Sequence, residues 1–256
     1  MIPKILHYCW MGGNPLPPSV KEYIKSWKKY CPDYEINEWN EDNFDISSTP
    51  LYVRQAYKAK MWSFVSDYVR LAVVYEYGGI YLDTDVEMIQ SFDPLLEEKA
   101  FFGFEDLKYV NTGHGFGAEK GASIILDMMN QYKDISFINE QSYDKTPCPI
   151  RNTHVLIKHG LSQNGETQYL ENNVIVFSSD YFCPKSINDG IVRKTKNTYS
   201  IHHFDATWFS EDQQKEKLDR WERKQKSAKQ KARRAKIKSA VIKVLGEKNY
   251  NKIRKK

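Results

Sequence analysis

Two aspartates separated by one residue, Asp83 and Asp85, are the clearest candidates for chemistry in this sequence. They follow the apolar segment 80–82, which predicts a short buried strand, and side chains at i and i+2 of an extended segment point to the same side. Two converging carboxylates without a neutralising basic neighbour suit a hard divalent cation, which completes its coordination with phosphate oxygens. Acidic pairs are also common in surface loops, so the context of this pair decides between the two interpretations.

A second charged pair, Asp67 and Arg70, precedes these aspartates on a predicted helix over residues 62–77. The helix is indicated by apolar residues at helical spacing and by the Gly78-Gly79 pair that ends it. Residues at i and i+3 share a helix face, so the pair is either a modest surface ion pair or a site for polar hydroxyls.

Two further segments carry polar residues that could join the site. Residues 202–208 follow the last predicted strand and begin with two histidines, and neutral imidazole is a good ligand for Mn²⁺. Residues 111–118 are rich in glycine but lack the Lys-Ser/Thr of a phosphate-binding P-loop. In this second segment Asn111 and His114 are the polar side chains that could contact a ligand.

The elements that must position these residues alternate between strands and helices. Further helices are predicted over 18–30, 50–60 and 123–132, and strands over 3–10, 34–39, 100–104, 174–177 and 198–202. This alternation is typical of an α/β sheet, in which ligands bind outside the carboxyl ends of the strands.

Composition supports a globular protein with two unlike parts. The chain has 256 residues and a net charge of +5, with 41% hydrophobic and 14% aromatic residues. Residues 1–210 carry 20 basic and 27 acidic side chains, whereas residues 211–256 carry 18 and 6. The basicity therefore belongs to the tail. We predict no membrane span and no signal peptide, and we interpret the four widely spaced cysteines as reduced thiols of a cytoplasmic protein.

The tail, residues 211–256, contains no proline and is predicted to be a basic amphipathic helix. Ile237, Val241, Val244 and Leu245 fall on one face, and lysines flank them. The tail is a solvated helix, a nucleic-acid arm or an interfacial helix on anionic lipid. We favour lipid, with additional anchors at Trp221 and Tyr250, because an apolar stripe serves a lipid interface and not a phosphate backbone.

The 22 residues from Phe64 to Asp85, which include Ser66-Asp67-Tyr68, Gly78-Gly79 and Asp83-Thr84-Asp85, resemble the signature of DXD-containing glycosyltransferases with a sugar-binding region. That family includes yeast Golgi mannosyltransferases and bacterial capsule and lipopolysaccharide transferases, and the clostridial glucosylating toxins are more distant members. The N-terminal segments 2–7 and 10–13 are also similar to its first strand and turn. The resemblance implies a GT-A fold with a Rossmann-like nucleotide-sugar domain and a mixed sheet over residues 1–210.

The resemblance also assigns roles to residues that bind the donor. Trp10 would stack on the base, although it could equally be a core aromatic residue. Asp67 and Arg70 would hydrogen-bond the donor sugar, and Tyr81 would lie near ribose or sugar. We place Asn111 and His114 on the acceptor or sugar side.

For the metal, the resemblance implies Mn²⁺ or Mg²⁺ with Asp85 and His203 as ligands. Asp83 would contact ribose and sugar hydroxyls and reach the metal through water. The indole of Trp208 would donate to a phosphate oxygen. At Ala206 the family offers a serine hydroxyl, which Thr207 or a water would have to replace. Asp83, Asp85 and Arg70 are the predicted catalytic residues.

The predicted function is transfer of a hexose, with retention, from a nucleotide sugar to a glycan acceptor, in bacterial surface polysaccharide synthesis. The family resemblance favours a UDP-linked donor. A lipid-linked acceptor would explain a tail that associates with the inner face of the cell membrane. Two alternatives remain. One is a phosphohydrolase of the haloacid dehalogenase type, which also has a D-x-D after a strand, and the other is a non-catalytic protein that binds nucleic acid through the tail. We expect no nucleic-acid partner.

Overall fold

The computed structural model describes residues 1–140, 142–205 and 210–245. Two compact units are present: residues 1–186 with 192–208, and residues 187–191 with 209 onward. The predicted site residues Asp67, Arg70, Asp83 and Asp85 belong to the first unit, and the predicted basic helix belongs to the second.

The first unit is built on a seven-stranded mixed sheet, which confirms the predicted α/β architecture. The strand order is β2-β1-β3-β6-β5-β8-β7. The strands are β1 (Ile5–Cys9), β2 (Glu35–Trp39), β3 (Gly79–Tyr81), β5 (Ala100–Gly103), β6 (Phe116–Ala118), β7 (Gln168–Leu170) and β8 (Val174–Phe177). The pairings make β1, β2, β3, β5 and β8 run in one direction and β6 and β7 in the other. The carboxyl ends of five strands therefore meet at one edge of the sheet.

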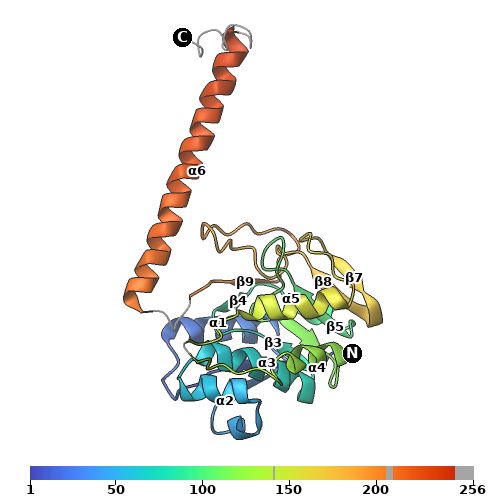
Figure 1. Ribbon diagram of the computed structural model, residues 1–256. Helices are drawn as coiled ribbons and strands as arrows, with labels where there is room; N and C mark the ends of the chain where they lie inside the picture. Colours follow the sequence, from blue (N-terminus) through green and yellow to red (C-terminus); the bar gives the residue numbers. More distant parts are fainter. Residues whose placement is uncertain (141, 206–209, 246–256) are drawn as a thin grey trace. The chain divides into compact units, whose positions relative to one another are not determined.

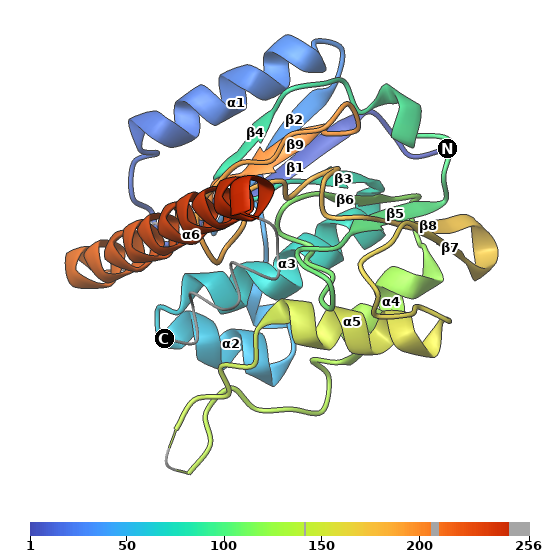
Figure 2. The same ribbon diagram turned by 90° about the horizontal axis from the view of Figure 1, so that it is seen from above.

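Helices cover both faces of this sheet (Figures 1 and 2). On one face lie α2 (Leu51–Lys58), α3 (Trp62–Tyr77), α4 (Ser123–Asn130) and α5 (Cys148–Lys158). The other face carries α1 (Pro18–Tyr30) and a separate antiparallel pair formed by β4 (Val86–Met88) and β9 (Ser200–His202). Short 3-10 turns occupy Ile46–Ser48, Asp93–Leu95 and Glu171–Asn173. Each face has its own apolar core, and the aromatic residues Phe92, Phe101 and Phe182 fill the α1 side.

The helix that precedes the DXD motif, α3, has the predicted bounds, Trp62–Tyr77. It ends where Gly78 takes φ +69°, a left-handed conformation that costs glycine little. A Cβ at Gly78 would also lie 2.8 Å from the backbone nitrogen of Lys120. Gly78 therefore stops the helix and lets the chain turn directly into β3.

The second unit contains α6 (Glu211–Leu245), a single long helix that confirms the helical prediction for this part of the tail (Figure 1). Trp221 is only 8% exposed, because its ring packs against the loop 187–191 and its Nε1 donates to the carbonyl of Ile187 at 2.8 Å. Trp221 is thus a structural residue of this unit and is not available as a membrane anchor. Tyr250 lies outside the described residues. No helix in the described part of the chain is long and apolar enough to cross a membrane.

Candidate active site

Polar residues gather at the sheet edge where the parallel strands end. Asp83 and Asp85 follow β3, and Glu105 follows β5, the strand that runs in the same direction two places further along the sheet. The backbone N–H of Asp83 donates to the carbonyl of Gly113 at 2.8 Å, which brings the glycine-rich segment before β6 to the same edge. The site is therefore assembled from three neighbouring strands.

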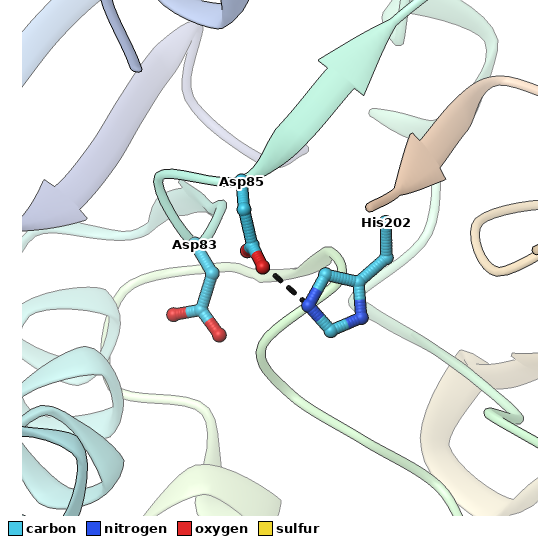
Figure 3. A group of neighbouring side chains, drawn as sticks. All are labelled: Asp83, Asp85 and His202. Carbon is cyan, nitrogen blue, oxygen red and sulfur yellow. Dashed lines mark ion pairs between the residues drawn. The ribbon is translucent and has the colours of Figure 1, made fainter. Parts of the chain in front are cut away.

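Asp83, Asp85 and His202 form a compact group that could hold a metal ion (Figure 3). One ligand atom from each residue lies within 4.8 Å of the others, and Asp85 Oδ1 is 3.2 Å from His202 Nε2. Strand pairing accounts for the arrangement, because Val86 of β4 is opposite His202 of β9. Two carboxylates and one imidazole suit Mn²⁺, and the carboxylates also suit Mg²⁺.

The electrostatics of this group are dominated by the pairing of Asp85 with His202. Burial opposes ionisation of Asp85, but His202 and the backbone N–H of Asp205 outweigh it and hold its pKa at about 2. Burial likewise disfavours a charged His202, yet Asp85 raises the pKa of this histidine well above its usual value. Without a metal the two residues therefore form an ion pair, and a cation bound at His202 Nε2 must displace a proton.

Arg70 connects α3 to this group. Its guanidinium lies 3.2 Å from Asp67 Oδ1 and 3.1 Å from Asp83 Oδ1, and only 3% of the residue is exposed. The predicted pairing of Asp67 with Arg70 is confirmed, and it is a buried contact and not a surface one. Gly113 leaves the room for this network, since a Cβ there would collide with the Asp83 carboxylate.

Tyr81 also supports Asp83. Its hydroxyl donates to Asp83 Oδ1 at 3.0 Å, its ring lies 5.1 Å from the Arg70 guanidinium, and the residue is 1% exposed. Tyr81 thus orients the first aspartate of the motif.

The structure puts His202, and not His203, beside the two aspartates. His203 Nε2 lies 3.0 Å from Glu87 Oε2, and its ring stacks on Tyr23 with 4.9 Å between centroids. The reason is strand alternation: His202 is the last residue of β9 and faces the motif, so the next side chain points elsewhere. Polar and apolar residues alternate along 198–202 (Thr-Tyr-Ser-Ile-His), and this sequence pattern puts His202 on the strand side opposite Ile201 and could have distinguished it from His203.

Trp10 follows β1 at the same sheet edge and is partly exposed, with its Nε1 donating to the carbonyl of Asn14 at 2.5 Å. Its ring is therefore held next to solvent and not deep in the core. Trp208, Ala206 and Thr207 lie outside the described residues.

Asn111 is 8% exposed, donates to Glu105 Oε2 at 2.5 Å and accepts from the backbone N–H of Gly113 at 2.6 Å. His114 is fully buried, and its ring centre is 6.1 Å from that of His202. Burial lowers the pKa of His114 well below its usual value, and His202 and Arg70 lower it further. Glu105 was not predicted as a site residue, and only the strand order brings it to this edge.

Comparison with known proteins gives a family match over the motif. Residues 17–102 match the model of the "Glycosyltransferase sugar-binding region containing DXD motif". Inositol phosphoceramide mannosyltransferase 3 of Schizosaccharomyces pombe is 36% identical over 104 residues, which is 39% of this chain and 29% of that protein. The uncharacterized glycosyltransferase L373 of Acanthamoeba polyphaga mimivirus is 29% identical over 119 residues, 44% of this chain and 47% of that protein. The chain thus spans less than half the length of these relatives.

Among solved structures, the chain is similar to the PaToxG glycosyltransferase, with a TM-score of 0.48 and 18% identity over 61% of this chain and 69% of that one. It is also similar to the galactosyltransferase LgtC in complex with donor and acceptor sugar analogs, with a TM-score of 0.41 and 15% identity over 84% of this chain and 95% of that one.

Proposed function

We propose that this chain, whose residues 17–102 match the family of glycosyltransferases with a DXD-containing sugar-binding region, transfers a hexose from a nucleotide sugar to a glycan acceptor with retention. The observation that carries the proposal is the group of Asp83, Asp85 and His202 at the carboxyl edge of the sheet. On this proposal the first unit is a GT-A catalytic domain, and Asp83, Asp85 and Arg70 are its catalytic residues.

Asp85 and His202 would bind Mn²⁺ or Mg²⁺ directly, and Asp83 would bind it directly or through water. When bound, the ion neutralises charge on the donor diphosphate. Asp85 is already oriented for this task, because its Oδ2 accepts from the backbone N–H of Asp205 at 2.9 Å. Ligands held in this way lose little freedom when the ion arrives.

Donor recognition would use the remaining polar groups of the edge. Trp10 would stack on the nucleotide base, and Trp208 would donate to a phosphate oxygen. Arg70, fixed between Asp67 and Asp83, leaves those carboxylates with free lone pairs for hydroxyls of the sugar or ribose. Asn111, with its partner Glu105, would hydrogen-bond on the acceptor side.

The chemistry we propose is same-face attack. The bond from the anomeric carbon to the diphosphate oxygen breaks, the acceptor oxygen forms its bond on the same face, and the departing phosphate oxygen takes the acceptor proton. A double displacement would need a carboxylate nucleophile free to reach the anomeric carbon. Asp83 is held by Arg70 and Tyr81, and Asp85 by His202, so neither is free for that role.

The haloacid dehalogenase alternative is not supported. That class needs its D-x-D after the first strand, whereas this motif follows β3. The family match over residues 17–102 also supports glycosyl transfer.

The donor class can be tested with a panel of UDP-glucose, UDP-galactose, their N-acetyl forms and GDP-mannose, each with and without Mn²⁺. We expect a UDP-linked hexose to raise the melting temperature only when Mn²⁺ is present, and to be slowly hydrolysed. A ligand at 100 times its Kd stabilises by about 2.7 kcal/mol, or roughly 5–10 °C for a domain of this size. If GDP-mannose is the active donor, the proposed UDP nucleotide is wrong and the proposed glycosyl transfer stands. A panel without any Mn²⁺-dependent shift or hydrolysis would refute the proposed activity.

We further propose that the acceptor is lipid-linked, that the pathway makes bacterial surface polysaccharide, and that the protein is cytoplasmic and peripheral on the inner membrane face. The support is the charge of α6, where residues 223–246 contain no acidic side chain. Ile237 is 55% exposed on this helix. The side chains of Val241, Val244 and Leu245, the rest of the apolar stripe, lie outside the described residues.

Vesicle binding tests the role of α6. Replacing the exposed Lys231, Arg233 and Arg234 by Gln should weaken binding to vesicles containing phosphatidylserine by about two orders of magnitude, since each basic residue contributes roughly 1 kcal/mol. The matched control replaces the exposed Lys21, Lys28 and Lys29 of α1, which removes the same charge and should change binding little. Equal losses in both variants, or binding to duplex DNA and not to vesicles, would contradict the membrane role.

A further inference from the structure

Three buried ring nitrogens next to the DXD group make no hydrogen bond of normal geometry within the described residues. They are Nδ1 of His202 and both Nδ1 and Nε2 of His114. Buried polar atoms are almost always paired with protein or with ordered water, so an unpaired cluster needs an explanation. The two rings belong to different segments, the end of β9 and the turn before β6, and their centres are 6.1 Å apart.

The ring of His114 is held in this position by its neighbours. It stacks on Phe182, with ring centres 6.3 Å apart and 22° between the planes. Gly103 lies against it, since a Cβ at Gly103 would come within 3.0 Å of His114 Cε1. The adjacent Gly113 is hydrogen-bonded to the backbone of Asp83. His114 is therefore built into the wall of the site and does not occupy it by chance.

A histidine that binds a metal through Nε2 carries its proton on Nδ1, and that proton needs an acceptor. His202 Nε2 faces Asp85, so Nδ1 is the nitrogen whose partner must fix the ring. The buried thiol of Cys183 interacts with His202, but sulfur is a weak acceptor and makes no hydrogen bond of normal geometry with Nδ1. A neutral imidazole offers one donor and one acceptor, and His114 is kept neutral by burial, which lowers its pKa.

We propose that His114 is a positioning residue, which accepts the Nδ1–H of His202 through one buried water and so keeps the His202 Nε2 lone pair directed at the site of Asp83 and Asp85. The spacing favours a water. Two imidazoles joined directly would have ring centres about 5 Å apart, given an N···N distance of roughly 3 Å, and 6.1 Å leaves room for a bridge. This inference rests on the proposed metal-dependent function.

Two substitutions test it through Mn²⁺ affinity, measured by the electron paramagnetic resonance signal of free Mn²⁺ in a titration of the full chain. His114→Phe fills the ring volume without an acceptor and should weaken Mn²⁺ binding about 10–100-fold. His114→Gln keeps a donor and an acceptor and should remain within about threefold of the wild type. Metal-free His114→Phe should still unfold in one cooperative transition, which separates a loss of Mn²⁺ affinity from a loss of the fold.

Tyr132→Phe is the matched control, because the Tyr132 hydroxyl is also buried without a partner but is not part of the DXD group. It should leave Mn²⁺ affinity unchanged. If the wild type does not bind Mn²⁺, the proposed function fails. If the wild type binds Mn²⁺ and His114→Phe binds it equally well, the inference about His114 is overturned.

A measurement on the wild type covers the case in which His114→Phe does not fold. In protein labelled with ¹⁵N-histidine and loaded with Mg²⁺, we expect the His202 proton on Nδ1. A proton on Nε2 would overturn the proposal.

Discussion

Asp85→Asn should lower the kcat/KM of metal-dependent donor hydrolysis by about 10²–10³-fold. The substitution keeps the shape of the side chain but removes the charge that both attracts the cation and pairs with His202 at 3.2 Å. Stabilisation of the leaving diphosphate by a metal is worth several kcal/mol, and each 1.36 kcal/mol is a factor of ten in rate. Asp83→Asn should act in the same direction. Initial rates of nucleotide release over a Mn²⁺ titration measure the effect, and excess Mn²⁺ should restore little activity.

Glu87→Gln is the matched control, because it makes the same chemical change two residues further along the chain. Glu87 is 41% exposed at its side chain and contacts His203, outside the metal group. We expect its kcat/KM to stay within about threefold of the wild type. Turnover near the wild-type rate in both Asp83→Asn and Asp85→Asn would refute the metal assignment, and equal losses in Glu87→Gln would point to a general charge effect.

The long elements of the fold could be predicted because their patterns extend over several turns. Helix α3 has sixteen residues of helical periodicity and a glycine stop, and α1 starts at a proline. Strands β4, β6 and β7 have three residues each, too few to show alternation, and none has as clear an apolar segment beside it as the one that marks the equally short β3. Helix α5 is not predicted from the sequence although Pro149 stands in its first turn, because its apolar residues are Ile150 and then the consecutive Val155, Leu156 and Ile157, which do not repeat at helical spacing.

The site shows the same division between local and long-range information. The pairing of Asp67 with Arg70 follows from helix geometry, and the side-by-side placement of Asp83 and Asp85 follows from an extended chain. His202 and Glu105 reach the edge only through the pairing of β4 with β9 and through the strand order, which sequence periodicity does not encode. The resemblance supplied a histidine in the correct segment but not the residue that faces the motif.

Arg70→Met should lower the melting temperature by about 10 °C or more. Arg70 is the cation between two buried carboxylates, Asp67 and Asp83, and removing one partner of a buried ion pair costs about 3–5 kcal/mol. In a domain of this size 1 kcal/mol corresponds to roughly 2–4 °C. Lys120→Met provides the comparison on the surface. Lys120 pairs with Glu76 at 3.5 Å with both side chains more than half exposed, and its loss should cost less than about 1 kcal/mol.

The pH dependence of Arg70→Met identifies the cause of the loss. Burial already raises the pKa of Asp67 and Asp83, and Arg70 is the nearby charge that lowers both. Without Arg70 the folded-state pKa values rise further above those of the unfolded chain, so the folded state binds more protons and stability falls as the pH rises through them. The loss of unfolding free energy relative to the wild type should therefore be smaller at pH 5 than at pH 8. Adding Asp67→Asn to the Arg70→Met variant should recover part of this loss. A deficit that is constant with pH would mean that Arg70 acts through packing, and that its charge does not hold the two aspartates in place.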